Sequence, residues 1–164
     1  MSMPMPMPVE PAAAVFLPRG QDRFSQLHDM GIGLLSFKVM GTESRDGLLI
    51  AEIAHHSPGG PPLHIHPHQD EWFSVVEGHY QIAVGDELFD LGPGDSVFGP
   101  RGVPHTWAYV GGDAGRMLFV ISPAGQMEGF LRALGQAKQM APQEPAFWQR
   151  YGLELAGPPI LPPG

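Results

Sequence analysis

The sequence has 164 residues, the size of one ordinary domain, which is enough to bury a single hydrophobic core. A formal net charge of -8, with no cluster of Lys or Arg, argues against binding to nucleic acid or to an anionic membrane surface. Hydrophobic residues make up 43% of the chain, and its 22 glycines and 19 prolines favour short elements joined by turns over long helices.

The chain contains no cysteine, which excludes disulfides and thiolate chemistry. A bound metal would therefore be held by nitrogen and oxygen ligands. The first twenty residues have no basic region, and their longest apolar run, Ala12 to Leu17, is too short for a signal peptide or a membrane span. We therefore expect a soluble, cytoplasmic protein.

In chain order, residues 1–20 are expected to form a Pro-rich tail, because prolines cannot donate the hydrogen bonds of regular structure. Short runs of strand-forming residues then alternate with turn signals, at about the 8 to 12 residue spacing of a β-sandwich or barrel. The expected strands lie within residues 34–41, 46–56, 61–66, 71–78, 80–84, 87–91, 92–111 and 115–123, with a hairpin turn at Gly85 and Asp86.

This pattern predicts an all-β fold, a jelly-roll β-barrel over residues 21–123. Residues 124–164 are expected to form a short helical extension with a Pro-rich tail. A helical repeat places Met127, Phe130, Leu131 and Leu134 on one face, and a second short helix is expected between Pro145 and Gly152. A two-fold homodimer is expected to form through the apolar end LELAGPPILPPG or through an exposed sheet face, and this end could equally pack on its own barrel.

The stretch PPLHIHPHQDEWFSVVEGH holds three of the four candidate metal ligands. Residues two apart on a strand face the same side, so His64 and His66 project together. Pro67 interrupts the strand, and the chain then turns back and brings Glu71 beside the two histidines. We expect the fourth ligand to be His105, which follows a Pro and Gly turn. His68 is expected in the turn after Pro67, exposed to solvent or beside the ligands.

Three neutral imidazoles and one carboxylate suit a divalent transition metal such as Ni, Fe, Mn, Co or Zn. Because each imidazole must be deprotonated to bind, metal occupancy should fall below pH of about 6.5. An aromatic substrate cavity would be lined by Phe73, Val75, Phe98, Trp107 and Phe119. The simpler alternative is that these side chains fill the barrel core.

These residues resemble the two motifs of the cupin superfamily. The first, G(X)5HXH(X)3-4E(X)6G, is matched by His64, His66, Glu71 and Gly78, with Pro58 in place of the first glycine. The second, G(X)5PXG(X)2H(X)3N, is matched by Gly94, Pro100, Gly102 and His105, with Tyr109 in place of the asparagine. Through these stretches and the continuation SPAGQMEGFLRAL, the chain resembles small single-domain cupins similar to bacterial quercetin 2,3-dioxygenase.

The resemblance implies a metal-dependent dioxygenase that binds a flavonol such as quercetin at a 3-His-1-Glu metal, inserts dioxygen and releases carbon monoxide. Glu71 would then act as a catalytic general base as well as a ligand. Two alternatives stay open. One is an oxygen-independent isomerase, lyase or decarboxylase, and the other is a cupin that binds a metal and a small ligand without turnover.

Overall fold

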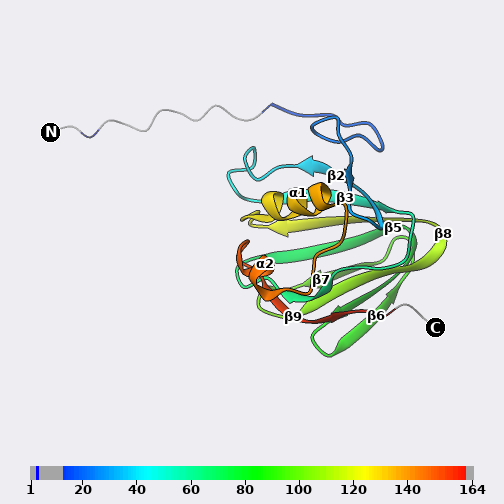
Figure 1. Cartoon of the computed structure of the whole chain (residues 1–164). Helices are drawn as coiled ribbons and strands as arrows, with labels where there is room; N and C mark the ends of the chain where they lie inside the picture. Colours follow the sequence, from blue (N-terminus) through cyan, green and yellow to red (C-terminus); the bar gives the residue numbers. More distant parts are fainter. Residues whose placement is uncertain (1–2, 4–12, 162–164) are drawn as a thin grey trace.

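The computed structural model of the chain describes Met3 and residues 13–161 (Figure 1). Most of the expected N-terminal tail, residues 1–2 and 4–12, lies outside this described part. At the described end of the tail, Arg19 forms an ion pair with Glu77, with Nη2 and Oε1 2.8 Å apart. Within the described residues, no helix combines the length and the apolar character needed to span a membrane.

Antiparallel strands dominate the chain, as the composition and turn spacing predict. They are β1 (His28–Asp29), β2 (Gly33–Val39), β3 (Leu49–His55), β4 (Pro62–Ile65), β5 (Asp70–Val84), β6 (Glu87–Leu91), β7 (Ser96–Gly99), β8 (His105–Ser122) and β9 (Glu154–Pro159). Their pairing order β1-β2-β3-β8-β4-β9, with β5 joining β6, β7 and β8, gives a jelly roll. The all-β prediction is confirmed, and so is the β5–β6 hairpin, in which Val84 pairs with Glu87.

Two strands are longer than the sequence pattern suggests. β5 joins the segments expected at 71–78 and 80–84, and β8 joins the end of the segment expected at 92–111 to that expected at 115–123. The two strands pair along both halves, with register shifts between Val75 and Tyr80. Gly78 allows β5 to bend there, because its φ of 82° suits glycine and an added Cβ would lie 2.5 Å from the Ala114 carbonyl oxygen.

The helices follow the barrel strands and cover one side of the jelly roll (Figure 1). They are α1 (Met127–Ala137) and α2 (Pro145–Gln149). The apolar face of α1 is buried as predicted, with Met127, Phe130, Leu131 and Leu134 turned inward. The helix ends at Lys138, whose left-handed backbone closes the last turn with a hydrogen bond to the Leu134 carbonyl.

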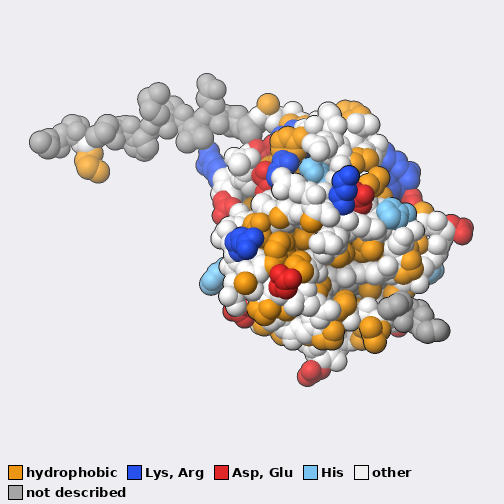
Figure 2. All heavy atoms as spheres, in the orientation of Figure 1, with side chains coloured by type: hydrophobic (Ala, Val, Ile, Leu, Met, Phe, Trp, Pro, Cys, Tyr) orange, Lys and Arg blue, Asp and Glu red, His pale blue; other side chains and the backbone are white. Residues whose placement is uncertain are grey.

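The end of the chain forms a strand where the sequence suggested a Pro-rich tail. β9 pairs with β4, so that His64 lies opposite Leu155 and Pro62 opposite Pro159. The structure thus shows that residues 154–159 pack on the sheet of their own chain, one of the two roles considered for this end. Prolines are accepted here because β9 is an edge strand and needs hydrogen-bond donors on one side only. Hydrophobic side chains gather on the surface around α2 and β9 (Figure 2).

Candidate metal centre

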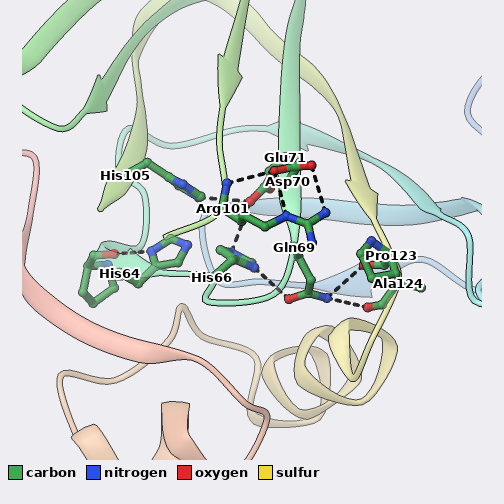
Figure 3. Close-up of polar contacts among 10 residues, drawn as sticks. His64, His66, Gln69, Asp70, Glu71, Arg101, His105, Pro123 and Ala124 are labelled. Atoms are coloured by element: carbon green, nitrogen blue, oxygen red, sulfur yellow. Dashed lines mark hydrogen bonds and ion pairs between the residues drawn. The ribbon is translucent and has the colours of Figure 1, made fainter. Parts of the chain in front are cut away.

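Three strands bring the four predicted ligands together. His64 lies in β4, and His66 follows directly after that strand. Glu71 is near the start of β5, and His105 begins β8 directly opposite His64. All four side chains are buried, and they offer ligand atoms that lie within 4.8 Å of one another. The strand alternation predicted from the sequence therefore assembles a possible 3-His-1-Glu metal site (Figure 3).

Hydrogen bonds orient two of the imidazoles. His64 Nδ1 lies 2.7 Å from the Pro62 carbonyl oxygen, and His66 Nδ1 lies 3.0 Å from the Gln69 Oε1. Both partners are acceptors, so each histidine carries its proton on Nδ1 and keeps a lone pair on Nε2. A fixed proton on the far nitrogen is the usual arrangement of histidines that bind metal ions.

The carboxylate of Glu71 lies between the imidazoles of His66 and His105. Its Oε2 is 3.2 Å from His66 Nε2 and 3.0 Å from His105 Nε2. His66 Nε2 is buried and has no hydrogen-bond partner. Its lone pair faces a carboxylate oxygen, which is repulsive unless a cation lies between them. The donor set therefore fits a divalent cation, held by three nitrogens and one oxygen.

Burial favours the neutral form of two of the imidazoles, those of His64 and His66. It is the largest cause that lowers the pKa of His64 well below its ordinary value, with nearby His105 and His66 acting in the same direction. Burial also lowers the pKa of His66, although the charge of Glu71 opposes the change. Neutral imidazoles are the form that binds metals, so at neutral pH these two ligands need not release a proton first.

The loops that carry the ligands are tied together at the surface. The Arg101 guanidinium donates to both carboxylate oxygens of Asp70, at 3.2 and 3.0 Å, and the Arg101 backbone N–H adds a third bond. Next to it, the Gly102 N–H donates to the His66 carbonyl at 2.9 Å. Arg101 is thus paired with a carboxylate outside the cavity, and the pairing lowers the pKa of Asp70.

A narrow apolar cavity opens beside the cluster. The cavity has a volume of about 40 Å³. His64, His66 and Glu71 form the polar part of its lining, and the other lining residues are apolar: Met30, Leu35, Ile53, Pro61, Trp107, Phe119, Met127, Phe130, Leu131, Leu134, Met140 and Trp148. The apolar face of α1 thus contributes to the cavity wall. No lysine or arginine is among the described lining residues.

The predicted substrate residues fall into three groups. Trp107 and Phe119 line the cavity. Phe73 and Val75 are buried in the core, as the simpler alternative had it, and the Phe73 ring packs edge-on against His105 at 5.4 Å. The prediction that Phe98 lines the cavity is wrong. Phe98 pairs with Trp72 on the outer face of the sheet and is 57% exposed. Its neighbour Gly99 takes the inward position opposite Glu71, which turns Phe98 outward.

The remaining histidines lie outside the cluster. His68 is exposed in its turn, which is one of the two placements expected for it, and His56 and His79 are also exposed. His28 and His55 are at strand ends, but both are buried, which the sequence did not indicate. Burial lowers the pKa of His55 to about 3, and a 2.6 Å hydrogen bond joins its Nδ1 to the Tyr80 hydroxyl.

Two residues beside the cluster were missed by the sequence analysis. Trp148 of α2 is fully buried, and its ring lies 4.7 Å from the His64 ring, centroid to centroid. Gln69 holds the far side of His66. A tryptophan so far along the chain carries no local signal of this contact. Gln69 could have been suspected only because it lies three residues after a candidate ligand.

Comparisons with known proteins agree with this arrangement. Residues 52–121 match the family described as "Cupin domain". KdgF from Halomonas sp. superposes with a TM-score of 0.57 at 19% identity, covering 68% of this chain and 94% of that one. An RmlC-like cupin from Shewanella frigidimarina gives 0.57 at 21% identity, covering 73% and 99%. This is a cupin fold.

Other similarities cover smaller parts of the chain or of the protein that it resembles. Oxalate decarboxylase from Bacillus subtilis superposes with a TM-score of 0.51 at 19% identity, covering 60% of this chain and 27% of that one. A protein named "Polyketide synthase CurC" from Streptomyces cyaneus is 33% identical over 60 residues, which is 37% of this chain. The matched stretch is 39% of that curated relative, less than half of its length. These similarities support the cupin fold, whereas the reaction has to be inferred from the cavity.

Proposed function

We propose that this chain is a metal-dependent dioxygenase that acts on an uncharged, enolisable aromatic compound. A flavonol such as quercetin, cleaved by 2,3-dioxygenation with release of carbon monoxide, is the substrate that the motif resemblance implies. The observation that carries the proposal is the 3-His-1-Glu cluster against an apolar cavity with no cationic side chain in its described lining.

The apolar lining of the cavity favours an uncharged substrate. A dicarboxylate would bring charge into an apolar wall without a lysine or arginine to pair with it, and such burial is costly. A neutral enol avoids this cost and packs its rings against Trp107 and Phe119. Glu71 is the only carboxylate among the described lining residues, so it is the group that can accept the enol proton.

The residues have separate tasks in this proposal. His64, His66, His105 and Glu71 would hold the ion, and Trp107 and Phe119 would orient the rings. When bound, a divalent ion lowers the pKa of an enol hydroxyl and mediates electron transfer to dioxygen. The apolar walls keep water away from the reacting carbon atoms.

The size of the cavity bears on the size of the substrate. Sites for drug-sized ligands usually enclose about 300 to 1,000 Å³. The space here, about 40 Å³, is far smaller. A three-ring flavonol therefore requires the cover formed by α1 and α2 to move outward, whereas a single-ring enol requires less movement.

Metal analysis followed by oxygen uptake tests the proposal. Purified protein is loaded in turn with Ni, Fe, Mn, Co and Zn, and its oxygen consumption and carbon monoxide release are measured with 3-hydroxyflavone, quercetin and the one-ring 3-hydroxy-4-pyranone maltol. We expect uptake with at least one metal and one of these enols. The His105→Ala variant should lose the metal, whereas His79→Ala, which changes an exposed histidine, should keep it.

Two results would contradict the proposal. No oxygen uptake by any loaded form with any of these enols would leave a binding protein or an enzyme of another kind. Conversion that continues under nitrogen would favour an oxygen-independent isomerase, lyase or decarboxylase.

A further inference from the structure

One side chain connects a metal-ligand candidate to the segment that leads into the covering helix. Gln69 is buried and lies between the His66 imidazole and the backbone at Pro123 and Ala124 (Figure 3). Its Oε1 is 3.0 Å from His66 Nδ1. Its Nε2 donates to the carbonyl oxygens of Pro123 and Ala124, at 3.1 and 2.8 Å. All the polar atoms of the amide therefore have partners in these two places.

The two carbonyls determine which way the amide points. A carbonyl oxygen only accepts hydrogen bonds, so it must face the NH₂ group of Gln69. The amide oxygen is then left facing His66 and can only accept the Nδ1–H. The backbone before α1 thus fixes the proton of His66 on Nδ1 and leaves Nε2 for the cluster.

The turn that supplies these carbonyls is itself anchored and leads directly into α1. The Ala124 N–H donates to the Asp46 carbonyl, and the Gly125 N–H donates to the Asp46 carboxylate, both at 3.0 Å. Two residues later α1 begins with Met127, which lines the cavity. A movement of α1 away from the cavity would pull on the turn that holds Gln69.

The backbone of Gly125 packs closely against the side-chain amide of Gln69. Its φ is +55°, and a Cβ added to it would lie 2.6 Å from Gln69 Nε2. A side chain at position 125 would therefore push the amide out of place. The backbone and the glutamine pack as one unit.

We propose that Gln69 is a positioning residue that couples the seating of α1 over the cavity to the metal-binding tautomer of His66. With α1 seated, the amide holds His66 with Nε2 toward the cluster. When α1 lifts, the amide loses its two carbonyl partners and His66 is no longer fixed. This inference rests on the cluster being a metal site, and it does not depend on which reaction follows.

The first test reads the tautomer directly, without metal or substrate. Nitrogen-15 NMR of the histidine side chains in metal-free protein should show His66 as the Nδ1–H form. In Gln69→Ala that preference should be lost, and affinity for Co²⁺, measured by titration of its visible spectrum, should fall by about 10- to 100-fold. Gln81→Ala is the matched control, because Gln81 makes a comparable side-chain bond to Asp90 away from the cluster.

The second test is a double-mutant cycle on the helix side. Gly125→Ala should weaken Co²⁺ binding in protein that carries Gln69, because the new methyl group displaces the amide. In Gln69→Ala the same change should have no further effect. Gly94→Ala controls for backbone strain, since Gly94 has φ +93° and no atom within 4 Å of an added Cβ.

The proposal is overturned if His66 keeps the Nδ1–H form in Gln69→Ala. Equal losses of affinity from Gly125→Ala with and without Gln69 would overturn it as well. Both results are independent of oxygen uptake. An absence of dioxygenase activity would therefore reject the proposed reaction and leave the role of Gln69 to these measurements.

Discussion

At the scale of single residues, strand pairing decides which side chains reach the cluster. The alternation of His64 and His66 predicts a shared face, and that face is buried in the structure. The side of the sheet that Phe98 occupies depends on the pairing of its neighbour Gly99 with Glu71, which no local pattern reveals. The role of Gln69 depends on a backbone turn more than fifty residues away, so spacing alone could not have indicated it.

His55 gives a prediction at this scale. Its folded-state pKa is about 3, below the value of about 6.5 expected in the unfolded chain. The unfolded chain therefore binds the extra proton, and His55 stabilises the fold fully only above pH of about 6.5. As pH falls from there toward 3, the free energy of unfolding should drop by up to about 1.4 kcal/mol per pH unit on account of this residue.

Urea unfolding of metal-free protein between pH 7 and pH 5 measures this effect. His55→Gln should have a shallower dependence on pH than the parent protein, whatever its stability at pH 7. His56→Gln, which changes the exposed neighbour, should keep the parent slope. Parallel curves for the parent and His55→Gln would show that His55 is not responsible.

The elements show where a sequence pattern stops being informative. The strand runs and the amphipathic face of α1 were predicted because each has a period of its own. The continuity of β5 was not, because Gly78 signals a turn in sequence but serves as a bend inside a strand. The sequence predicts a tail where β9 lies because Pro158 and Pro159 argue against a strand, although an edge strand tolerates them.

Deletion of residues 154–164 tests the role of β9. Without β9, β4 loses the partner that pairs with His64 and Ile65. We expect the free energy of unfolding to fall by about 2 to 4 kcal/mol, from lost hydrogen bonds and apolar burial. Urea denaturation measures the change. A deletion of residues 160–164 alone is the control, and equal midpoints for the two truncated proteins would show that β9 adds no stability.

At the scale of the whole molecule, one sheet face carries apolar side chains that the fold itself does not cover. Register pairs place them side by side across five strands, none of them fully buried: Val39, Ile50, Val120, Trp72 and Phe98. Trp72 is 38% exposed and Phe98 57%. Because β9 packs on its own sheet, this face is the better candidate for the homodimer contact expected from the sequence.

Sedimentation velocity tests this expectation. The parent protein should sediment as a species of twice the 17.7 kDa chain mass. The double variant Trp72→Glu and Phe98→Glu should sediment as a monomer, since two buried carboxylates without partners oppose association. Leu88→Glu is the control, because Leu88 is 56% exposed on β6, outside the row. A parent protein that is monomeric at all concentrations would reject the dimer.

The junction of β4 with β8 has a mechanical consequence. Neighbouring strands are ordinarily joined by a ladder of backbone hydrogen bonds that involves several residue pairs. Between β4 and β8, the described residues contain a single register pair, which consists of the ligand candidates His64 and His105. The next backbone pair lies before β4, where Gly59 bridges Tyr109. An ion bound by both imidazoles would therefore add a cross-link between two strands that share a single register pair of their own. Removal of the ion would then loosen the contact between β4 and β8 beside the cavity, so that the shape of the cavity and its metal chemistry would be lost together.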